Sequence, residues 1–265
     1  MDDAILASLE HENMVATMSW FGGSVDGALV REVDGVTLMS TMLPVRMFNQ
    51  VVVSGSDPTD VALRDAVADV RRRTDRWIVN LRNGPDDRFL PLMEELGLVP
   101  VSPEPWMPGM AMWPLPAANA VPVPSGIDIR RATDVAGLAD HVTAAAEGFG
   151  MPADWLEDLM GDAILDEPGV AVYVGYTNRV PVATGLGAIT GPTIGVYNIA
   201  TVPGARQRGY GAAMTMRIVD DGAAAGCDVA ILQASDMGKP IYERLGFRTV
   251  VEYVGYVDPA TMGGD

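Results

Sequence analysis

The chain has 265 residues, which is enough for one large domain or for two domains of ordinary size. Its 35 acidic and 18 basic residues give a formal net charge of −17, and such a surface repels nucleic acid and anionic membranes. The first residues lack the basic segment of a signal peptide, and no apolar run approaches the roughly 18 residues of a membrane span, so we expect a cytoplasmic protein that binds neither partner.

Cysteine and histidine are scarce. The one cysteine, Cys227, lies in an apolar run and is expected to be a small core residue. The two histidines, His11 and His141, are far apart in the sequence. We therefore expect neither a disulfide framework nor a metal site.

The N-terminal half ends in a proline-rich stretch. A helix is predicted from Pro58 to about Arg73, and an apolar strand from Trp77 to Leu81. Eight prolines follow between Pro100 and Pro124, which is incompatible with a continuous helix or a central strand. The predicted organisation is an N-terminal domain over residues 1–115, a linker over 116–126 and a C-terminal domain over 127–265.

The C-terminal half begins with a strand, two helices and a hairpin. Asp134, after Thr133, is a suitable N-cap for the first helix. The second helix is acidic, and a Thr177-Asn178-Arg179 turn joins the two strands of the hairpin. The predicted elements are the strand Ile127–Arg130, the helices Val135–Glu147 and Met151–Leu165, and the strands Val170–Tyr176 and Pro181–Ile189.

A loop with the pattern R-x-x-G-x-G follows the next strand. The strand runs from Ile194 to Val202, the loop from Arg206 to Gly211, and a helix from Ala212 to Ala225. Such a loop points backbone N–H groups at an anion, and its glycines let a phosphate approach the backbone. Met214 replaces the third glycine of a dinucleotide fingerprint, and the only lysine, Lys239, is followed by proline, so neither a Rossmann nor a P-loop pattern fits.

A second motif lies after a buried strand predicted from Cys227 to Gln233. Residues 235–247 read S-D-M-G-K-P-I-Y-E-R-L-G-F, with a short helix expected over 237–245. A last strand, Phe247 to Val257, is expected to complete the sheet of the C-terminal half.

The two motifs together resemble those of the GNAT N-acetyltransferase superfamily. The family's Arg/Gln-x-x-Gly-x-Gly/Ala loop typically begins three residues after a proline, here Pro203. Its second motif, Asn-x-x-Ala-x-x-x-Tyr-x-x-x-Gly-Phe, is matched at Tyr242, Gly246 and Phe247, while Ser235 and Gly238 replace the Asn and the Ala. The resemblance covers about half of the chain, roughly 127–257. It implies an α/β (α+β) fold, with a mixed, mostly antiparallel sheet flanked by helices.

The resemblance also implies a cofactor, acetyl-CoA, and roles for particular residues. The pyrophosphate would be held by the loop, which comprises Arg206, Gln207, Arg208, Gly209, Tyr210, Gly211 and Ala212. A bulge in the preceding strand, at Ile199, Ala200, Thr201 and Val202, would free an N–H group of Ile199 or Ala200 for the thioester oxygen. Ser235 would contribute to the cofactor site. Tyr242 would be the general acid, because a phenol with a pKa near 10 is protonated at pH 7.

The base and the acceptor are left open. No Asp or Glu occurs from Gly169 to Val202, although relatives often carry a glutamate on these strands. The candidate bases are Glu147, Asp154 and Glu157, and the acidic second helix also fits a solvated surface. Glu147, Asn198 and Tyr197 are the candidate acceptor-binding residues. The excess of carboxylates favours a cationic acceptor, and a small molecule with a primary amine is expected.

A faint internal repeat extends the resemblance to the N-terminal half. Residues 91–98, P-L-M-E-E-L-G-L, align with residues 240–247, and four of the eight pairs are identical. Met93 stands where the tyrosine is expected, and the R-x-x-G-x-G loop is missing. A tandem GNAT arrangement with a degenerate first half is therefore predicted, as a monomer or homodimer. The alternatives are an enzyme like mycothiol synthase or glycine acyltransferase, and a non-catalytic acyl-CoA sensor or scaffold.

Overall fold

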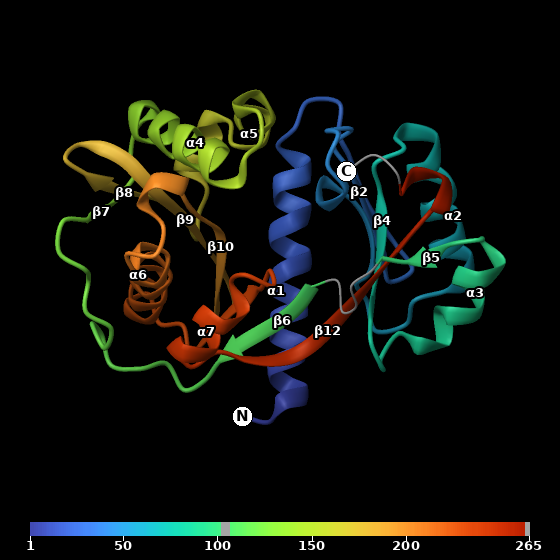
Figure 1. Ribbon diagram of the computed structural model, residues 1–265. Helices are drawn as coiled ribbons and strands as arrows, with labels where there is room; N and C mark the ends of the chain where they lie inside the picture. Colours follow the sequence, from blue (N-terminus) through green and yellow to red (C-terminus); the bar gives the residue numbers. More distant parts are fainter. Residues whose placement is uncertain (102–106, 263–265) are drawn as a thin grey trace. The chain divides into compact units, whose positions relative to one another are not determined.

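The computed structural model describes residues 1–101 and 107–262 (Figure 1). The chain divides into two compact units. Unit 1 comprises Met1–Asn13 and Met110–Arg248, and unit 2 comprises the described parts of Met14–Gly109 and Thr249–Asp265. Two of the eight linker-region prolines, at positions 103 and 105, lie outside the described residues. No helix in the described ranges is long and apolar enough to cross a membrane.

Unit 1 contains most of the elements predicted for the C-terminal half. The predicted boundaries hold within about two residues, except that the acidic second helix is divided into a helix and a 3₁₀ turn. The elements after the linker are β7 (Asp128–Arg131), α4 (Val135–Phe149), α5 (Ala153–Leu159), η3 (Asp162–Asp166), β8 (Val170–Thr177), β9 (Val180–Thr190), β10 (Thr193–Thr201), η4 (Pro203–Ala205), α6 (Tyr210–Ala224), β11 (Val229–Gln233) and α7 (Lys239–Leu245).

The sheet of unit 1 is mixed and mostly antiparallel, as predicted. Its strand order is β6-β11-β10-β9-β8-β7, where β6 is Met107–Met112. The hairpin strands β7 to β10 pair antiparallel, and β10 pairs parallel with β11 because α6 forms the crossover between them. Helices α4 and α6 cover opposite faces (Figure 1). Gly148 of α4 packs on Ala200, whereas Met214 and Ile218 of α6 pack over Gly185.

Local chemistry sets the ends of these elements. The Asp134 side chain accepts a hydrogen bond from the backbone N–H of Gly137 at 2.8 Å, and α4 ends at the left-handed Gly150. Asn178 and Arg179 both have positive φ, 51° and 67°, as a tight hairpin turn of the I′ kind requires. The predicted cap and turn are therefore confirmed.

Unit 2 repeats part of this order. After the second part of α1 (Asp3–Gly23), its elements are β1 (Leu29–Val33), β2 (Val36–Ser40), η1 (Arg46–Phe48), β3 (Asn49–Val53), α2 (Asp60–Arg73), β4 (Ile78–Arg82), η2 (Asp87–Phe89), α3 (Leu90–Glu95), β5 (Val99–Pro100) and most of β12 (Arg248–Val257). Strands β3 and β4 pair parallel on either side of α2, as β10 and β11 do around α6. Gly97 after α3 and Gly246 after α7 both have positive φ, 70° and 102°.

The last predicted strand forms as β12. It pairs antiparallel with β4 of unit 2, with Tyr253 opposite Arg82, and in the sheet order it lies between β4 and β6. In unit 1 the strand beside β11 is β6. The alternating burial of β12 fixes which face is covered but carries no information about which strand it pairs with. Each unit is made of two separate segments of the chain.

Candidate functional site

The R-x-x-G-x-G loop forms the start of α6. After the 3₁₀ turn η4, Gln207 and Gly209 have positive φ, 62° and 80°, and Gly209 is the N-cap of the helix. A glycine adopts this conformation without strain and carries no side chain that would cap the first turn. The first turn of α6 is therefore left open toward its N-terminal end.

The backbone N–H groups of the loop have no hydrogen-bond partner. Within the part of the chain that the structure describes, no acceptor lies within bonding distance of the amides from Gln207 to Ala212. The first amide with a partner is that of Ala213, which donates to the Gly209 carbonyl at 3.0 Å. Unpaired amides at the start of a 15-residue helix carry the positive end of its dipole, so the loop is suited to an anion.

The corresponding turn of unit 2 is closed. The backbone N–H groups of Ser54 and Gly55 donate to the Gly35 carbonyl at 2.8 and 3.0 Å. Thr59 caps α2 by accepting from the Ala62 amide at 3.1 Å. Because these donors bond within the protein, the turn has fewer free N–H groups to bind an anion than the loop before α6.

The two arginines of the loop contact carbonyl groups. Arg206 donates to the Thr201 carbonyl at 3.1 Å and to the Gly148 carbonyl at 2.7 Å, so it ties the loop to β10 and α4. Arg208 donates to the Gly204 carbonyl at 3.2 Å. Both side chains are exposed, and their charges lie at the start of α6.

Strand β10 carries a bulge. Tyr197 lies opposite Leu186 and Ala200 opposite Thr184, so β10 has one extra residue between these pairs. The irregularity lies at Asn198, with a φ of 53°, and Ile199, at the start of the range expected from the sequence. The Val202 amide, at the end of that range, donates to the Val182 carbonyl at 3.0 Å and is not free.

A buried histidine fixes the bulge. His141 of α4 has no exposed surface, and its Nδ1 lies 2.9 Å from the Tyr173 carbonyl, which can only accept. Nδ1 therefore carries the proton, and Nε2 accepts from the Asn198 side-chain amide at 2.8 Å. Burial lowers the pKa of His141 to about 4, which keeps the ring neutral. Sequence reasoning missed this residue, although a histidine among the apolar positions of a helix is a signal for a buried polar contact.

The residues predicted to bind the acceptor are not equivalent. Tyr197 is buried, and its hydroxyl donates to Asn13 Oδ1 at 2.6 Å. Asn198 uses its amide on His141. Glu147 is exposed on α4, next to Gly148, which packs on the bulged strand at Ala200. Asn198 thus lies at the bulge, Glu147 is exposed on the helix whose Gly148 packs on it, and Tyr197 belongs to the interior of unit 1.

Tyr242 lies on α7, shortly after β11. Its ring packs edge-on against Phe247, with ring centroids 6.1 Å apart, and its hydroxyl has no hydrogen-bond partner among the residues described. Burial raises the pKa of Tyr242 to about 12, so the phenol keeps its proton at neutral pH. A Cβ on Gly238 would lie 2.8 Å from the Tyr242 ring, so a side chain at this position of this chain would displace the ring. Ser235 Oγ accepts from the Gly238 amide at 3.2 Å.

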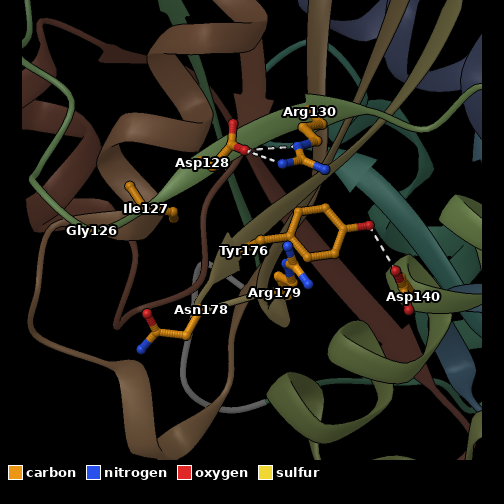
Figure 2. A pocket seen from close by; sticks show the side chains of 8 residues that line it. All are labelled: Gly126, Ile127, Asp128, Arg130, Asp140, Tyr176, Asn178 and Arg179. Carbon is orange, nitrogen blue, oxygen red and sulfur yellow. Dashed lines mark hydrogen bonds and ion pairs between the residues drawn. The ribbon is translucent and has the colours of Figure 1, made fainter.

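A surface hollow of about 710 Å³ lies elsewhere in unit 1, between β7, β8 and α4 (Figure 2). Several of its polar groups pair with one another: Asp128 with Arg130, and the Tyr176 hydroxyl with Asp140 at 2.8 Å. Arg179, from the hairpin turn, also lines it. None of the site residues predicted from the sequence lines this hollow, so it is distinct from the loop before α6.

Comparisons with known proteins agree with this geometry. Residues 170–250 match the family model described as an acetyltransferase (GNAT) domain, a range that runs from β8 through the loop and α7 into β12. No curated protein matches the sequence significantly. A solved structure of a GCN5-related N-acetyltransferase from Kribbella flavida covers 96% of both chains, with a TM-score of 0.66 at 18% identity.

Two further solved structures share the fold. A GCN5-related N-acetyltransferase from Sphaerobacter thermophilus has a TM-score of 0.55 at 21% identity, over 84% of this chain and 80% of that one. A conserved protein of unknown function from Staphylococcus epidermidis has a TM-score of 0.57 at 16% identity, over 88% and 95%. Residues 170–250 thus match a GNAT acetyltransferase domain model, and the chain shares the fold of these GCN5-related N-acetyltransferases.

Proposed function

We propose that this protein is an N-acetyltransferase that transfers the acetyl group of acetyl-CoA directly to a primary amine of a small molecule. The observation that carries the proposal is the run of unpartnered backbone N–H groups from Gln207 to Ala212, at the start of α6 and beside the bulged strand β10. This arrangement supplies a cradle for a pyrophosphate and, next to it, a strand whose regular pairing is interrupted.

In this proposal the thioester of acetyl-CoA lies at the bulge. Beyond Gly195, β10 no longer pairs with β11, so the pantetheine arm can lie along β10 as an added strand. The amides of Ile199 or Ala200 then polarise the thioester oxygen, as an oxyanion hole does. Thr201 Oγ1 and Ile199 Cγ2 lie 3.6 and 3.8 Å from the position of a Cβ on Gly211, so the glycine leaves space between α6 and this strand.

Tyr242 protonates the departing thiolate in this proposal. Its phenol retains a proton because burial raises its pKa to about 12, and its hydroxyl is not engaged by another group of the described structure. Loss of a positioned general acid costs about 10²- to 10⁴-fold in rate. Ser235 shapes the turn into α7 that presents this tyrosine.

Charge is the basis of the proposed acceptor. Glu147 is exposed on α4 next to the residue that packs on the bulge, and it is the carboxylate we assign to the acceptor amine. A net charge of −17 favours a cationic acceptor over an anionic one.

Unit 2 is proposed to be a degenerate second copy of the fold. It shares the parallel strands around a helix and the short helix that ends in a left-handed glycine. Its turn before α2 is closed by internal hydrogen bonds, and Met93 stands at the place of the tyrosine. We therefore assign acetyl-CoA to unit 1.

The proposal is tested with Tyr242→Phe. Acetyl-CoA binding is measured by calorimetry, and acetylation of a panel of polyamines, aminoglycosides and amino-acid amines is followed by mass spectrometry. We expect the variant to bind acetyl-CoA as the wild type does and to lose at least about a hundredfold in kcat. Tyr176→Phe is the matched control, because this tyrosine lies at the separate hollow, and it is expected to retain activity.

The absence of a carboxylate on the central strands favours one alternative, a non-catalytic acyl-CoA sensor. Acetyl-CoA binding without turnover of any amine, in both the wild type and Tyr242→Phe, would support the sensor and overturn the enzymatic proposal. Turnover confined to a neutral or acidic acceptor would overturn the assignment of a cationic amine.

A further inference from the structure

Strands β10 and β11 separate at a defined point. Their parallel pairing comprises Thr193–Gly195 and Val229–Ile231, and Gly195 and Ile231 form its last pair. The next residues on the same sides of the two strands are Tyr197 and Gln233. In a regular sheet these two residues would be neighbours, but here each makes its side-chain hydrogen bond to α1.

The first part of α1 supplies both contacts. The Tyr197 hydroxyl donates to Asn13 Oδ1 at 2.6 Å, and Gln233 Nε2 donates to Glu10 Oε1 at 2.5 Å. Glu10 and Asn13 are three residues apart and therefore lie on one face of the helix. Both are fully buried.

The contact on β10 is tightly built. Asn13 also donates from Nδ2 to the Ala188 carbonyl of β9 at 3.1 Å, so its amide is oriented by two groups. A Cβ on Gly195 would lie 2.1 Å from Asn13 Oδ1 and 2.3 Å from the Tyr197 ring. Glycine at position 195 is therefore required for the helix to reach the strand.

A fully buried carboxylate is costly unless hydrogen bonds compensate it. Glu10 is fully buried and accepts a hydrogen bond from Gln233, at the end of β11, which offsets part of the cost of burying its carboxyl group. The same applies to Asn13, which occupies a position where an apolar side chain would leave the Tyr197 hydroxyl without this acceptor.

We propose that Glu10 and Asn13 are positioning residues that hold β10 and β11 apart, so that the gap between the strands admits the thioester of acetyl-CoA. This inference rests on the proposed function. The first residues of the chain are then part of the acetyl-transfer site, although the sequence motifs lie about two hundred residues away. Neither residue is assigned a proton-transfer step.

The test compares four variants. Asn13→Ala and Glu10→Ala remove the two contacts, and Glu10→Gln keeps an oxygen that accepts from Gln233. Glu12→Ala is the control, because Glu12 is exposed on the same helix and accepts only from the Ser8 hydroxyl among the bonds found there. For each protein, hydrogen exchange of residues 196–201 and 231–234 is measured without ligand, and KM for acetyl-CoA and kcat are measured with the acceptor.

We expect Asn13→Ala and Glu10→Ala to accelerate exchange in both segments at least about tenfold and to raise KM more than they lower kcat. Glu10→Gln and Glu12→Ala should remain within about threefold of the wild type. If Glu10→Ala fails to fold, Tyr197→Phe, which keeps the ring, replaces it and is expected to accelerate exchange in residues 196–201.

Three results would overturn the proposal. Unchanged exchange in Asn13→Ala and in Glu10→Ala or its replacement would show that the contacts do not hold the strands. A Glu10→Gln variant with unchanged exchange but a lost acid limb in its pH profile would make Glu10 a proton acceptor instead. If calorimetry showed that the wild type does not bind acetyl-CoA, the proposed function would be overturned. The gap between the strands would then have no assigned ligand.

Discussion

The buried His141 makes the stability of unit 1 depend on pH. The ring is neutral in the folded protein, since its pKa is lowered from 6.5 to about 4 by burial. Above pH 6.5 neither state binds the proton, and the full stability is present. As the pH falls below 6.5, the unfolded chain binds a proton that the folded chain rejects, so stability is lost until the pH reaches about 4.

The magnitude follows from the two pKa values. Each pKa unit corresponds to about 1.4 kcal/mol, so the complete loss is about 3 kcal/mol, of which about 2 kcal/mol is reached at pH 5. His141→Gln removes the titration and retains an amide that can donate to the Tyr173 carbonyl and accept from Asn198. We expect this variant to be less stable than the wild type at pH 7.5, by about 1–2 kcal/mol, because the amide fits the two partners less well.

The assay is urea unfolding of the wild type and His141→Gln at pH 7.5, 6 and 5, followed by circular dichroism. The stability gap between the two proteins should shrink by about 2 kcal/mol between pH 7.5 and pH 5, because only the wild type binds this proton on unfolding. Proton NMR of the imidazole, assigned with His11→Gln, should show no titration of His141 above pH 5. A constant gap, or an imidazole that titrates near 6.5, would refute the reasoning.

Three further predictions concern single side chains. Gly238→Ala should lower kcat by up to about a hundredfold with little change in acetyl-CoA affinity, because the methyl group displaces the Tyr242 ring. Steady-state kinetics and calorimetry measure the two quantities, and an unchanged kcat would contradict the prediction. Asp134→Ala should cost about 1 kcal/mol in the free energy of unfolding through loss of the N-cap of α4, and equal stability in urea would show that the cap is dispensable. Gly195→Ala should cost about 2 kcal/mol or more through its clash with Asn13, and a melting temperature equal to that of the wild type would contradict the close approach.

Local sequence patterns predicted the elements of unit 1 because their signals are short-range. The Asp134 cap, the left-handed hairpin turn at Asn178 and the glycines of the loop before α6 each act within a few residues. The spacing from Pro203 to Gly211 also predicted a loop at the start of a helix, and the structure has the loop there.

The remaining features depend on contacts between distant residues. The pairing of β12 with β4 joins segments about 170 residues apart, and an alternating strand is compatible with either neighbour. The contact between Asn13 and Tyr197 spans 184 residues. His141 could be placed on a helix from the sequence, but its partner Asn198 became evident only where the bulge brought the two side chains together.

The proposed activity requires the backbone N–H groups from Gln207 to Ala212 to hold a pyrophosphate. The most direct measurement is calorimetry with coenzyme A, and with pantetheine, which lacks the pyrophosphate, on the wild type, Gly211→Val and the control Gly23→Val. Gly23 has open space at its Cβ position, so this control tests the substitution itself. We predict that the wild type and Gly23→Val bind coenzyme A much more tightly than pantetheine. Gly211→Val should lose at least about tenfold in affinity for coenzyme A and keep its affinity for pantetheine. Equal affinity for the two ligands, or wild-type binding of coenzyme A by a folded Gly211→Val, would contradict the account.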